Sequence, residues 1–404
     1  MTLEIRPINS EEFEAFALAG SNSFGEARLE HVEDERAILD FDRTLAAFDG
    51  EEIVATAAIL DFDLSVPGSQ LPAAGISWVS VRPTHRRQGL LTRMMERQLS
   101  DVRDRGESIA ALWASESIIY GRFGYGVAAL GSDLRIDRTF ANLAHGVDAP
   151  GRCRMVSREQ ALSTWPAIYA GVAKGQPGMY SRSENWWKHH SLRYDDPKKA
   201  KEATFYVQYE EEDRPLGYVR YTIKPHWRDN LPDGTLNIEE LVHATHGAYA
   251  ALWNYIFGVD LMSTFASGRS RIDEPLLWML DEPRRLVSRS YDALWLRLVD
   301  VPSALEARRY PTAGKIVIDV DDSFCPWNAG RYELQAGPDG AICKSTKAKP
   351  DLALTAADLA TVYLGGPRIR ALAQAGRVDG DADAIKRADR LFSWDITPWC
   401  PEVF

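Results

Sequence analysis

The residues WVSVRPTHRRQGLLTRMM, numbered 78–95, decide the fold of the first third of this chain. The stretch opens with a strand-like alternation, continues as an arginine-rich loop, and ends with apolar residues at the spacing of one buried helix face. This pattern predicts a strand over Ala74–Val81 and a helix over Leu90–Arg103. Because the next run, Ile109–Trp113, is again strand-like, the helix is expected to connect two strands of a mixed α/β sheet.

The loop itself is a candidate anion site. Gly89 lets the backbone approach a pyrophosphate closely, the unpaired N–H groups of the first helical turn donate to its oxygens, and Arg86 and Arg87 add positive charge. From the bare pattern, a basic loop that merely opens a surface helix fits equally well.

A second stretch, EELVHATHGAYAALWNYI at residues 239–256, repeats the apolar placement of residues 78–95 and its Thr-His dipeptide. We infer an internal duplication. The aligned residues Gly247, Ala248 and Ala250 replace the two arginines and the glycine of the first copy, so both the charge and the close approach are lost. The second copy is therefore predicted not to bind the anion.

The length of 404 residues suggests two or three domains, and we place them at 1–148, 149–289 and 290–404. The first two are expected to be mixed α/β units. The third is expected to be a small α+β unit, with strands and helices at Leu294–Leu298, Lys315–Val320, Gly330–Leu334, Ala356–Tyr363 and Ala382–Phe392.

Composition narrows the class of protein. The chain is 45% hydrophobic and 26% charged, and it contains no apolar run long enough to span a bilayer. A formal net charge of −11 disfavours a nucleic-acid surface. The four cysteines are scattered without CxxC spacing, so neither a disulfide framework nor a metal site is expected. The N-terminus does not resemble a secretion signal, which makes a cytoplasmic location the expectation.

Two further segments attract attention. Residues 114–126, ASESIIYGRFGYG, interleave glycines with aromatic residues, which indicates a tight segment packed on the sheet. Residues 394–404, WDITPWCPEVF, are unusually apolar for a chain end and are expected to be tucked against the protein. Simple packing is the alternative to a functional role for each.

The loop resembles the acetyl-CoA loop of the GNAT superfamily of N-acetyltransferases, in which Arg or Gln, two residues, Gly, one residue, and Gly or Ala follow in order. Arg86 and Gly89 match, whereas Leu91 departs from the last position. The resemblance implies that acetyl-CoA is bound here and that the second copy binds no CoA. The implied contacts come from the backbone of the preceding strand and from the loop, at Val79, Val81, Arg86, Arg87, Gln88, Gly89 and Leu90.

The whole chain resembles the Eis (enhanced intracellular survival) family within that superfamily. The resemblance rests on IYGRFGYG at 119–126, on the degenerate second copy and on a third domain like a sterol carrier protein. It implies that Tyr120 is the general acid and the terminal carboxylate of Phe404 the general base, without a metal. It also implies a homohexamer and small-molecule amine acceptors of cationic type, such as aminoglycosides, or lysine side chains. Another small amine or peptide as acceptor, and an apolar-ligand carrier acting through the third domain, remain alternatives.

These assignments suit the chemistry. A primary amine with a pKa of roughly 10 must lose a proton before it attacks a thioester. An α-carboxylate, with a reference pKa of about 3.5, is a weak base in water, but burial among Trp394, Trp399 and Phe404 is expected to raise that pKa. Direct transfer from sulfur to nitrogen needs no enzyme nucleophile.

Other residues receive more modest expectations. Acidic residues that a polycation could meet are Glu26, Glu30, Glu33, Asp34, Glu35 and Glu402, although most are expected to be a solvated face. We expect Tyr180, Trp186 and Trp187 to be core. His85 and His246 occupy matching places in both copies and are expected to be structural.

Overall fold

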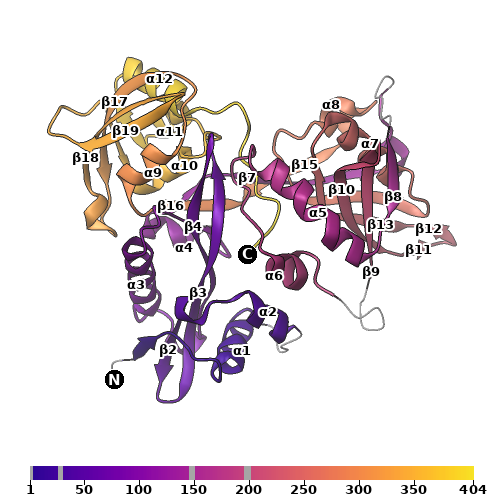
Figure 1. The fold of residues 1–404 in the computed structure, drawn as a ribbon, viewed down its shortest axis with the longest axis horizontal. Helices are drawn as coiled ribbons and strands as arrows, with labels where there is room; N and C mark the ends of the chain where they lie inside the picture. The colour runs from indigo at the N-terminus through magenta and orange to yellow at the C-terminus, as the bar shows by residue number, and fades with distance from the viewer. Residues whose placement is uncertain (1–2, 26–30, 145–150, 195–201) are drawn as a thin grey trace.

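The computed structural model describes residues 3–25, 31–144, 151–194 and 202–404. Figure 1 shows three lobes, each built around one sheet, with the C-terminus lying between them. The arrangement confirms the predicted fold class of two mixed α/β units followed by a smaller α+β unit. No helix within the described residues is long and apolar enough to cross a membrane.

The first sheet has seven strands. In spatial order they are β1 (Glu4–Arg6), β2 (Thr44–Asp49), β3 (Glu52–Val66), β4 (Ser69–Val81), β5 (Ile109–Trp113), β16 (Leu294–Leu298) and β6 (Gly126–Val127). Only β4 and β5 run parallel, joined by the predicted helix. Its helices are α1 (Phe13–Ser23), α2 (Val32–Ile38), α3 (Leu90–Asp104) and α4 (Ser117–Tyr120).

The second sheet repeats this plan, which bears out the inferred duplication. Its order is β8 (Arg152–Met155), β9 (Ala203–Glu211), β10 (Arg214–Lys224), β13 (Gly234–His243), β14 (Met262–Ser270), β7 (Leu130–Asp137) and β15 (Val287–Asp292). Again one neighbouring pair, β13 and β14, is parallel. The helices are α5 (Arg158–Ala173), α6 (Glu184–Trp186), α7 (His246–Phe257) and α8 (Leu276–Met279), and a small ribbon joins β11 (Trp227–Arg228) to β12 (Leu231–Pro232).

The two sheets exchange one strand each. Strand β16, which was expected in the third domain, lies between β5 and β6 of the first sheet, and β7, expected in the first domain, lies between β14 and β15 of the second. The expected boundaries after residues 148 and 289 therefore do not separate the sheets. The physical reason is that β5 and β14 each have backbone N–H and C=O groups on one side that need partners. A strand from the other half, β16 or β7, supplies these hydrogen bonds.

The third unit packs directly on the first sheet. Its strands are β19 (Gly340–Ser345), β18 (Gly330–Gly337), β17 (Gly314–Asp321), β20 (Leu352–Thr355) and β21 (Val378–Gly380), and its helices are α9 (Val301–Ala307), α10 (Ala356–Val362), α11 (Ile369–Gln374) and α12 (Ala382–Phe392). Helix α10 begins at a capping threonine, since the Thr355 hydroxyl accepts the Asp358 N–H at 3.2 Å.

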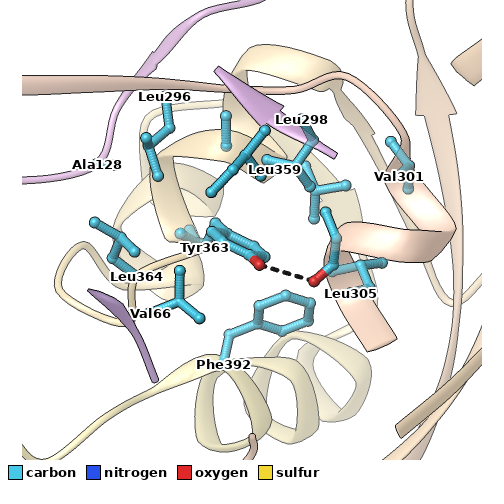
Figure 2. Packing of buried hydrophobic residues seen from close by; sticks show 14 of the residues in the cluster. Val66, Ala128, Leu296, Leu298, Val301, Leu305, Leu359, Tyr363, Leu364 and Phe392 are labelled. Carbon is cyan, nitrogen blue, oxygen red and sulfur yellow. Dashed lines mark hydrogen bonds between the residues drawn. The ribbon is translucent and has the colours of Figure 1, made fainter. Parts of the chain in front are cut away.

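One apolar core joins the third unit to the first. Figure 2 shows Leu296 and Leu298 of β16 facing Leu359 and Tyr363, with Phe392 of α12 on the far side. All five side chains are buried. Burial of apolar surface across this junction holds the third unit, and with it the C-terminal tail, in a fixed place.

Candidate active site

The site begins where β4 and β5 separate. The two strands pair only from Ala73 with Ile109 to Gly75 with Ala111, so the rest of β4 has a free edge on that side. A bulge lies just beyond, because Trp78 and Val79 together oppose a single residue of β3. Trp78 has φ 57°, and its carbonyl accepts the Thr56 hydroxyl at 2.7 Å.

Below this opening lies a cavity of ≈ 760 Å³, the loop cavity, which includes the predicted anion loop. Arg87 (φ 64°) and Gly89 (φ 75°) both have left-handed backbone, a conformation that turns successive N–H groups toward one concavity. Gly89 is the N-cap of α3 and offers no side chain to its first-turn N–H groups. A Cβ on Gly89 would meet no atom within 4 Å, so the space over the loop is open. This donor set fits the pyrophosphate of a CoA thioester.

The corresponding helix of the second unit differs in every one of these respects. Its N-cap Thr245 accepts the Ala248 N–H at 3.1 Å, so a side chain already satisfies the first turn. The opening between β13 and β14 holds Trp399 and Pro401 of the C-terminal tail and leaves a cavity of only ≈ 40 Å³. That this copy binds no CoA stays a prediction, which these two features favour.

Most of the predicted cofactor residues come together in the loop cavity. Those that border it are Val79, Val81, Arg86, Arg87, Gly89 and Leu90. Arg86 donates through Nε to the Val81 carbonyl at 3.0 Å, which folds its side chain back over the strand end. Gln88 does not border the cavity, and its amide donates to the Thr84 carbonyl at 3.3 Å.

Tyr120 lies where two cavities meet. It ends α4 and borders both the loop cavity and a second one of ≈ 450 Å³, the tail cavity, which Val403 and Phe404 also border. Only 4% of Tyr120 is exposed, and burial raises the pKa of its hydroxyl above the ordinary tyrosine value. The phenol therefore stays protonated near neutral pH and can donate a proton or hydrogen bond.

The C-terminal tail is held by the second unit. The Trp399 N–H donates to the Pro177 carbonyl at 2.8 Å, and its indole Nε1 donates to the Arg269 carbonyl at 2.7 Å. Arg269, with φ 55°, in turn donates through Nε to the Pro401 carbonyl at 3.1 Å. The predicted tucked tail is thus confirmed, and it lies at the opening between β13 and β14, which corresponds to the opening between β4 and β5 of the first unit.

Glu402 anchors the tail further. One carboxylate oxygen lies 2.9 Å from Arg182 Nε and accepts hydrogen bonds from Tyr180, Trp186 and Ser191 at 3.0, 2.9 and 3.1 Å. Burial raises the pKa of Glu402, but Arg182 together with His190, the Trp186 indole N–H and Arg220 outweighs it, and the pKa falls to about 2. The expectation that Glu402 meets a polycation is therefore wrong, because its carboxylate is buried and is bound by groups of the protein itself.

Phe404 lies where β4 and β5 stop pairing. Its ring packs edge-on against Phe62 and Tyr180, with centroid distances of 5.0 and 5.3 Å. A Cβ on Gly75, the last paired residue of β4, would lie 3.2 Å from the Phe404 ring and 2.5 Å from Phe62. The end of the chain is thus packed at the strand separation, on the cavity that Tyr120 borders.

The other acidic candidates are divided. Glu35 borders the tail cavity, whereas Asp34 is paired with His189 at 2.7 Å. Glu33 is exposed, as expected of a solvated face. Glu26 and Glu30 lie outside the described residues.

The three aromatic residues expected in the core are buried, as predicted, whereas His246 is exposed at the start of α7. Tyr180, Trp186 and Trp187 are buried. His85 is bound to Thr84 Oγ1 at 2.8 Å and lies 3.4 Å from Asp49, which fits a structural role at the rim of the loop cavity.

Sequence reasoning missed several residues that shape the tail cavity. Phe24, Trp78 and Trp113 border it, and Ser115 borders both cavities. The one available signal was position, since Trp113 ends β5 and Trp78 lies near the end of β4, where the two strands separate. No group of three or more His, Cys, Asp or Glu residues that could hold a metal ion occurs in the part of the chain described.

Comparison with known proteins assigns the class. The profile of the acetyltransferase (GNAT) domain matches residues 4–128, a second acetyltransferase (GNAT) profile matches 178–298, and that of the sterol carrier protein domain matches 301–401. Together with a separated parallel strand pair and an uncapped helix over a cavity, these matches define an N-acetyltransferase of the GNAT superfamily, a group that uses acetyl-CoA.

Relatives then identify the family. The chain is 34% identical over 360 residues to N-acetyltransferase Eis of Mycobacterium tuberculosis, covering 86% of this chain and 85% of that protein. The crystal structure of Eis1 from Mycobacterium abscessus superposes with a TM-score of 0.86 at 33% identity, over 99% and 100% of the two chains. An uncharacterized N-acetyltransferase of Streptomyces avermitilis is 37% identical over 413 residues and the full length of both proteins. The chain belongs to the Eis family of GNAT N-acetyltransferases.

Proposed function

We propose that this enzyme transfers the acetyl group of acetyl-CoA directly to a primary amine of a small-molecule acceptor. The observation that carries the proposal is that Tyr120 and Phe404 border one cavity, and that Tyr120 also borders the loop cavity beside it. In this proposal Tyr120 is the donor for the leaving thiolate and the Phe404 carboxylate is the base for the attacking amine, at the cavity that both residues border.

The cofactor side of the proposal rests on the loop. The N–H groups of the first turn of α3 and the left-handed backbone at Arg87 and Gly89 would hold the pyrophosphate. The free edge of β4 at Val79 and Val81 would pair with the pantetheine arm. The bound thioester supplies the activated acetyl group.

The chain's own groups then move two protons. The terminal carboxylate of Phe404 takes a proton from the acceptor's ammonium group, and the freed amine attacks the thioester carbonyl carbon. The new C–N bond forms as the C–S bond breaks, and Tyr120 donates its phenolic proton to the departing sulfur. The attacking nitrogen releases its second proton to solvent as the amide forms, and the proton held by the carboxylate returns to the Tyr120 phenolate through solvent.

For the acceptor, the family resemblance points to aminoglycosides and lysine side chains, and another small amine or peptide is the alternative. The resemblance also carries the proposals of a homohexamer and of a cytoplasmic enzyme without a nucleic-acid or membrane partner. An apolar-ligand carrier is less well supported, because apolar side chains of the third and the first unit pack together in the core between them (Figure 2).

The test is thiol release from acetyl-CoA with a panel of aminoglycosides, polyamines and lysine peptides. Wild type is compared with a chain extended by one residue after Phe404 and with a chain carrying the same extra residue at its N-terminus. Amine-dependent release that collapses only on C-terminal extension supports the proposal. Equal rates in all three proteins would show that the terminal carboxylate is not the base. If none of the amines in the panel causes thiol release, the proposed activity is contradicted.

A further inference from the structure

The segment that carries Tyr120 is a tight turn. Tyr120 is followed by a single 3₁₀ turn, Gly121–Phe123, and the chain reverses at Gly124, where φ is 81°. Two backbone hydrogen bonds close this turn, from the Gly124 N–H to the Gly121 carbonyl at 3.0 Å and from the Tyr125 N–H to the Tyr120 carbonyl at 3.3 Å. The place of Gly124 therefore sets the place of the Tyr120 backbone.

Arg297 lies directly against Gly124. It belongs to β16, and its side chain is completely buried. A Cβ on Gly124 would overlap Arg297 Nη1 and would lie 2.6 Å from Arg297 Cζ, so only glycine leaves room for the guanidinium at this point. Because protein interiors are close-packed, a shift of this guanidinium would also shift the turn.

The third unit holds the guanidinium in place through Asp322, which directly follows β17. Arg297 Nη2 donates to Asp322 Oδ2 at 2.5 Å, and both side chains are buried. Asp322 is itself fixed, because its Oδ1 accepts the Cys325 N–H at 2.9 Å and its Oδ2 accepts a hydrogen bond from Asn328 Nδ2 at 3.3 Å. A chain of contacts thus leads from the third unit to the turn.

Two further contacts bring the third unit against the same segment. Phe324 packs edge-on against Phe123, with ring centroids 4.9 Å apart. A Cβ on Gly126 would overlap the Ala357 carbonyl oxygen of α10 and would lie 2.8 Å from the Thr361 backbone nitrogen, so no side chain fits there. Residues 123–126 therefore rest on the third unit, while Tyr120 borders the two cavities.

An ion pair is a costly way to support a turn inside a core. Desolvation of two buried charges offsets most of their attraction, and apolar side chains of similar volume would join the two units at least as stably. What the pair adds is direction, because a charge-assisted hydrogen bond fixes the guanidinium in both distance and angle. The pair is thus better suited to positioning than to stability.

We propose that Asp322, acting through Arg297, is a positioning residue for Tyr120, and that the third unit thereby supports the chemical step. The pair holds the turn at Gly124 so that the Tyr120 hydroxyl keeps its place where the loop and tail cavities meet. Among the described residues that border these cavities, neither Asp322 nor Arg297 occurs, so substrate binding is not their role. This inference rests on the proposed function of Tyr120 as the acid.

Asp322→Asn tests the proposal, because it keeps the shape of the side chain and removes its charge. We expect kcat for thiol release to fall about tenfold, since a small misplacement of a reacting group slows the chemical step, while the KM for acetyl-CoA stays near the wild-type value. Asp389→Asn is the matched control. Asp389 is a buried carboxylate of the same unit, paired with Arg368 at 2.6 Å where α12 meets the start of α11, and its variant should keep wild-type kcat.

Two combined variants separate positioning from stability. Arg297→Met with Asp322→Leu removes both charges and keeps the core filled, so the melting temperature should return toward wild type while kcat stays about tenfold low. In a Tyr120→Phe background, Asp322→Asn should lower kcat no further, because its effect passes through the hydroxyl that is already missing. If Asp322→Asn does not fold, the apolar pair decides alone.

The outcomes separate this inference from the proposed function. Wild-type kcat in Asp322→Asn, recovery of kcat together with the melting temperature in the apolar pair, or a further loss of kcat in the Tyr120→Phe background would overturn the inference and leave amine acetylation standing. Wild-type kcat in Tyr120→Phe itself would instead overturn the proposed acid, and the inference with it.

Discussion

The surroundings of Tyr120 differ from those of two other buried tyrosines, Tyr125 and Tyr180. Tyr125, five residues on, is wholly buried and its hydroxyl reaches only the Met95 sulfur, at 3.9 Å. Tyr180 is also fully buried and donates to Glu402. Tyr120 alone of these three borders both cavities. Its hydroxyl, whose pKa is raised by burial, is therefore the one placed to reach a substrate.

Replacement of this hydroxyl should therefore be costly for the chemical step. Tyr120→Phe is expected to lower kcat by about a hundredfold, since a positioned acid typically contributes that much, while the KM for acetyl-CoA changes little. Steady-state thiol release at saturating substrate measures it. Tyr125→Phe is the matched control and should keep nearly full kcat; if the two variants behave alike, Tyr120 acts only by packing.

At the scale of elements, the two related strand–loop–helix segments have the same fold, but only the first has the features of an anion site. Helix α3 begins at a glycine beneath an open cavity, whereas α7 begins at a capping threonine beside the seated tail. The difference arises from a few side chains, because backbone N–H groups at a helix start bind either a cap or a ligand.

Gly89 and Gly106 offer a matched pair at the two ends of α3. Both have positive φ, 75° and 77°, and a Cβ on either meets nothing within 4 Å. Alanine should cost each about 1 kcal/mol of stability through backbone strain. Only Gly89→Ala should also raise the KM for acetyl-CoA, by about tenfold, because its Cβ enters the space where the pyrophosphate would lie. A similar KM in both variants would argue against the loop as the phosphate site.

The same contrast predicts the binding stoichiometry. Titration calorimetry should give one acetyl-CoA per chain, and Arg86→Ala with Gly89→Ala should weaken that single event. A second, independent binding event that survives in this variant would mean that the second copy retains a site.

For the whole molecule, the tail is the element that ties three units into one enzyme. It leaves α12 of the third unit, is bound by the second at Trp399 and Glu402, and ends on the first at Phe404 (Figure 1). The reciprocal exchange of β7 and β16 joins the first two units through their sheets, and the tail contacts both of them.

This arrangement predicts an acid-sensitive stability. The pKa of Glu402 is lowered in the folded protein from 4.5 to about 2, so its contribution is complete above about pH 4.5 and is lost as the pH falls toward 2. Glu402→Gln is expected to destabilise the protein by about 3 kcal/mol at neutral pH, because it leaves Arg182 buried with Glu240 as its remaining carboxylate. Denaturant unfolding at neutral pH and near pH 2 checks this: the gap between wild type and variant should shrink in acid, and a constant gap would contradict it.

The sequence by itself determined the local units of this protein. The spacing of residues 78–95 was sufficient for the strand, the loop and α3, and the degenerate repeat at 239–256 indicated the duplication, since periodicity and special backbone residues are encoded within a few turns. The gathering of Val79, Arg86 and Gly89 around one cavity follows from that local order.

Only the tertiary structure decided the exchange of β7 and β16, the burial of Glu402 against Arg182 and the seating of Trp399 in the second unit's opening. These contacts join residues far apart in the chain. Nothing in the spacing around Glu402 distinguishes a carboxylate that faces solvent from one that meets a buried guanidinium, because partner choice depends on which surfaces the completed sheets bring together.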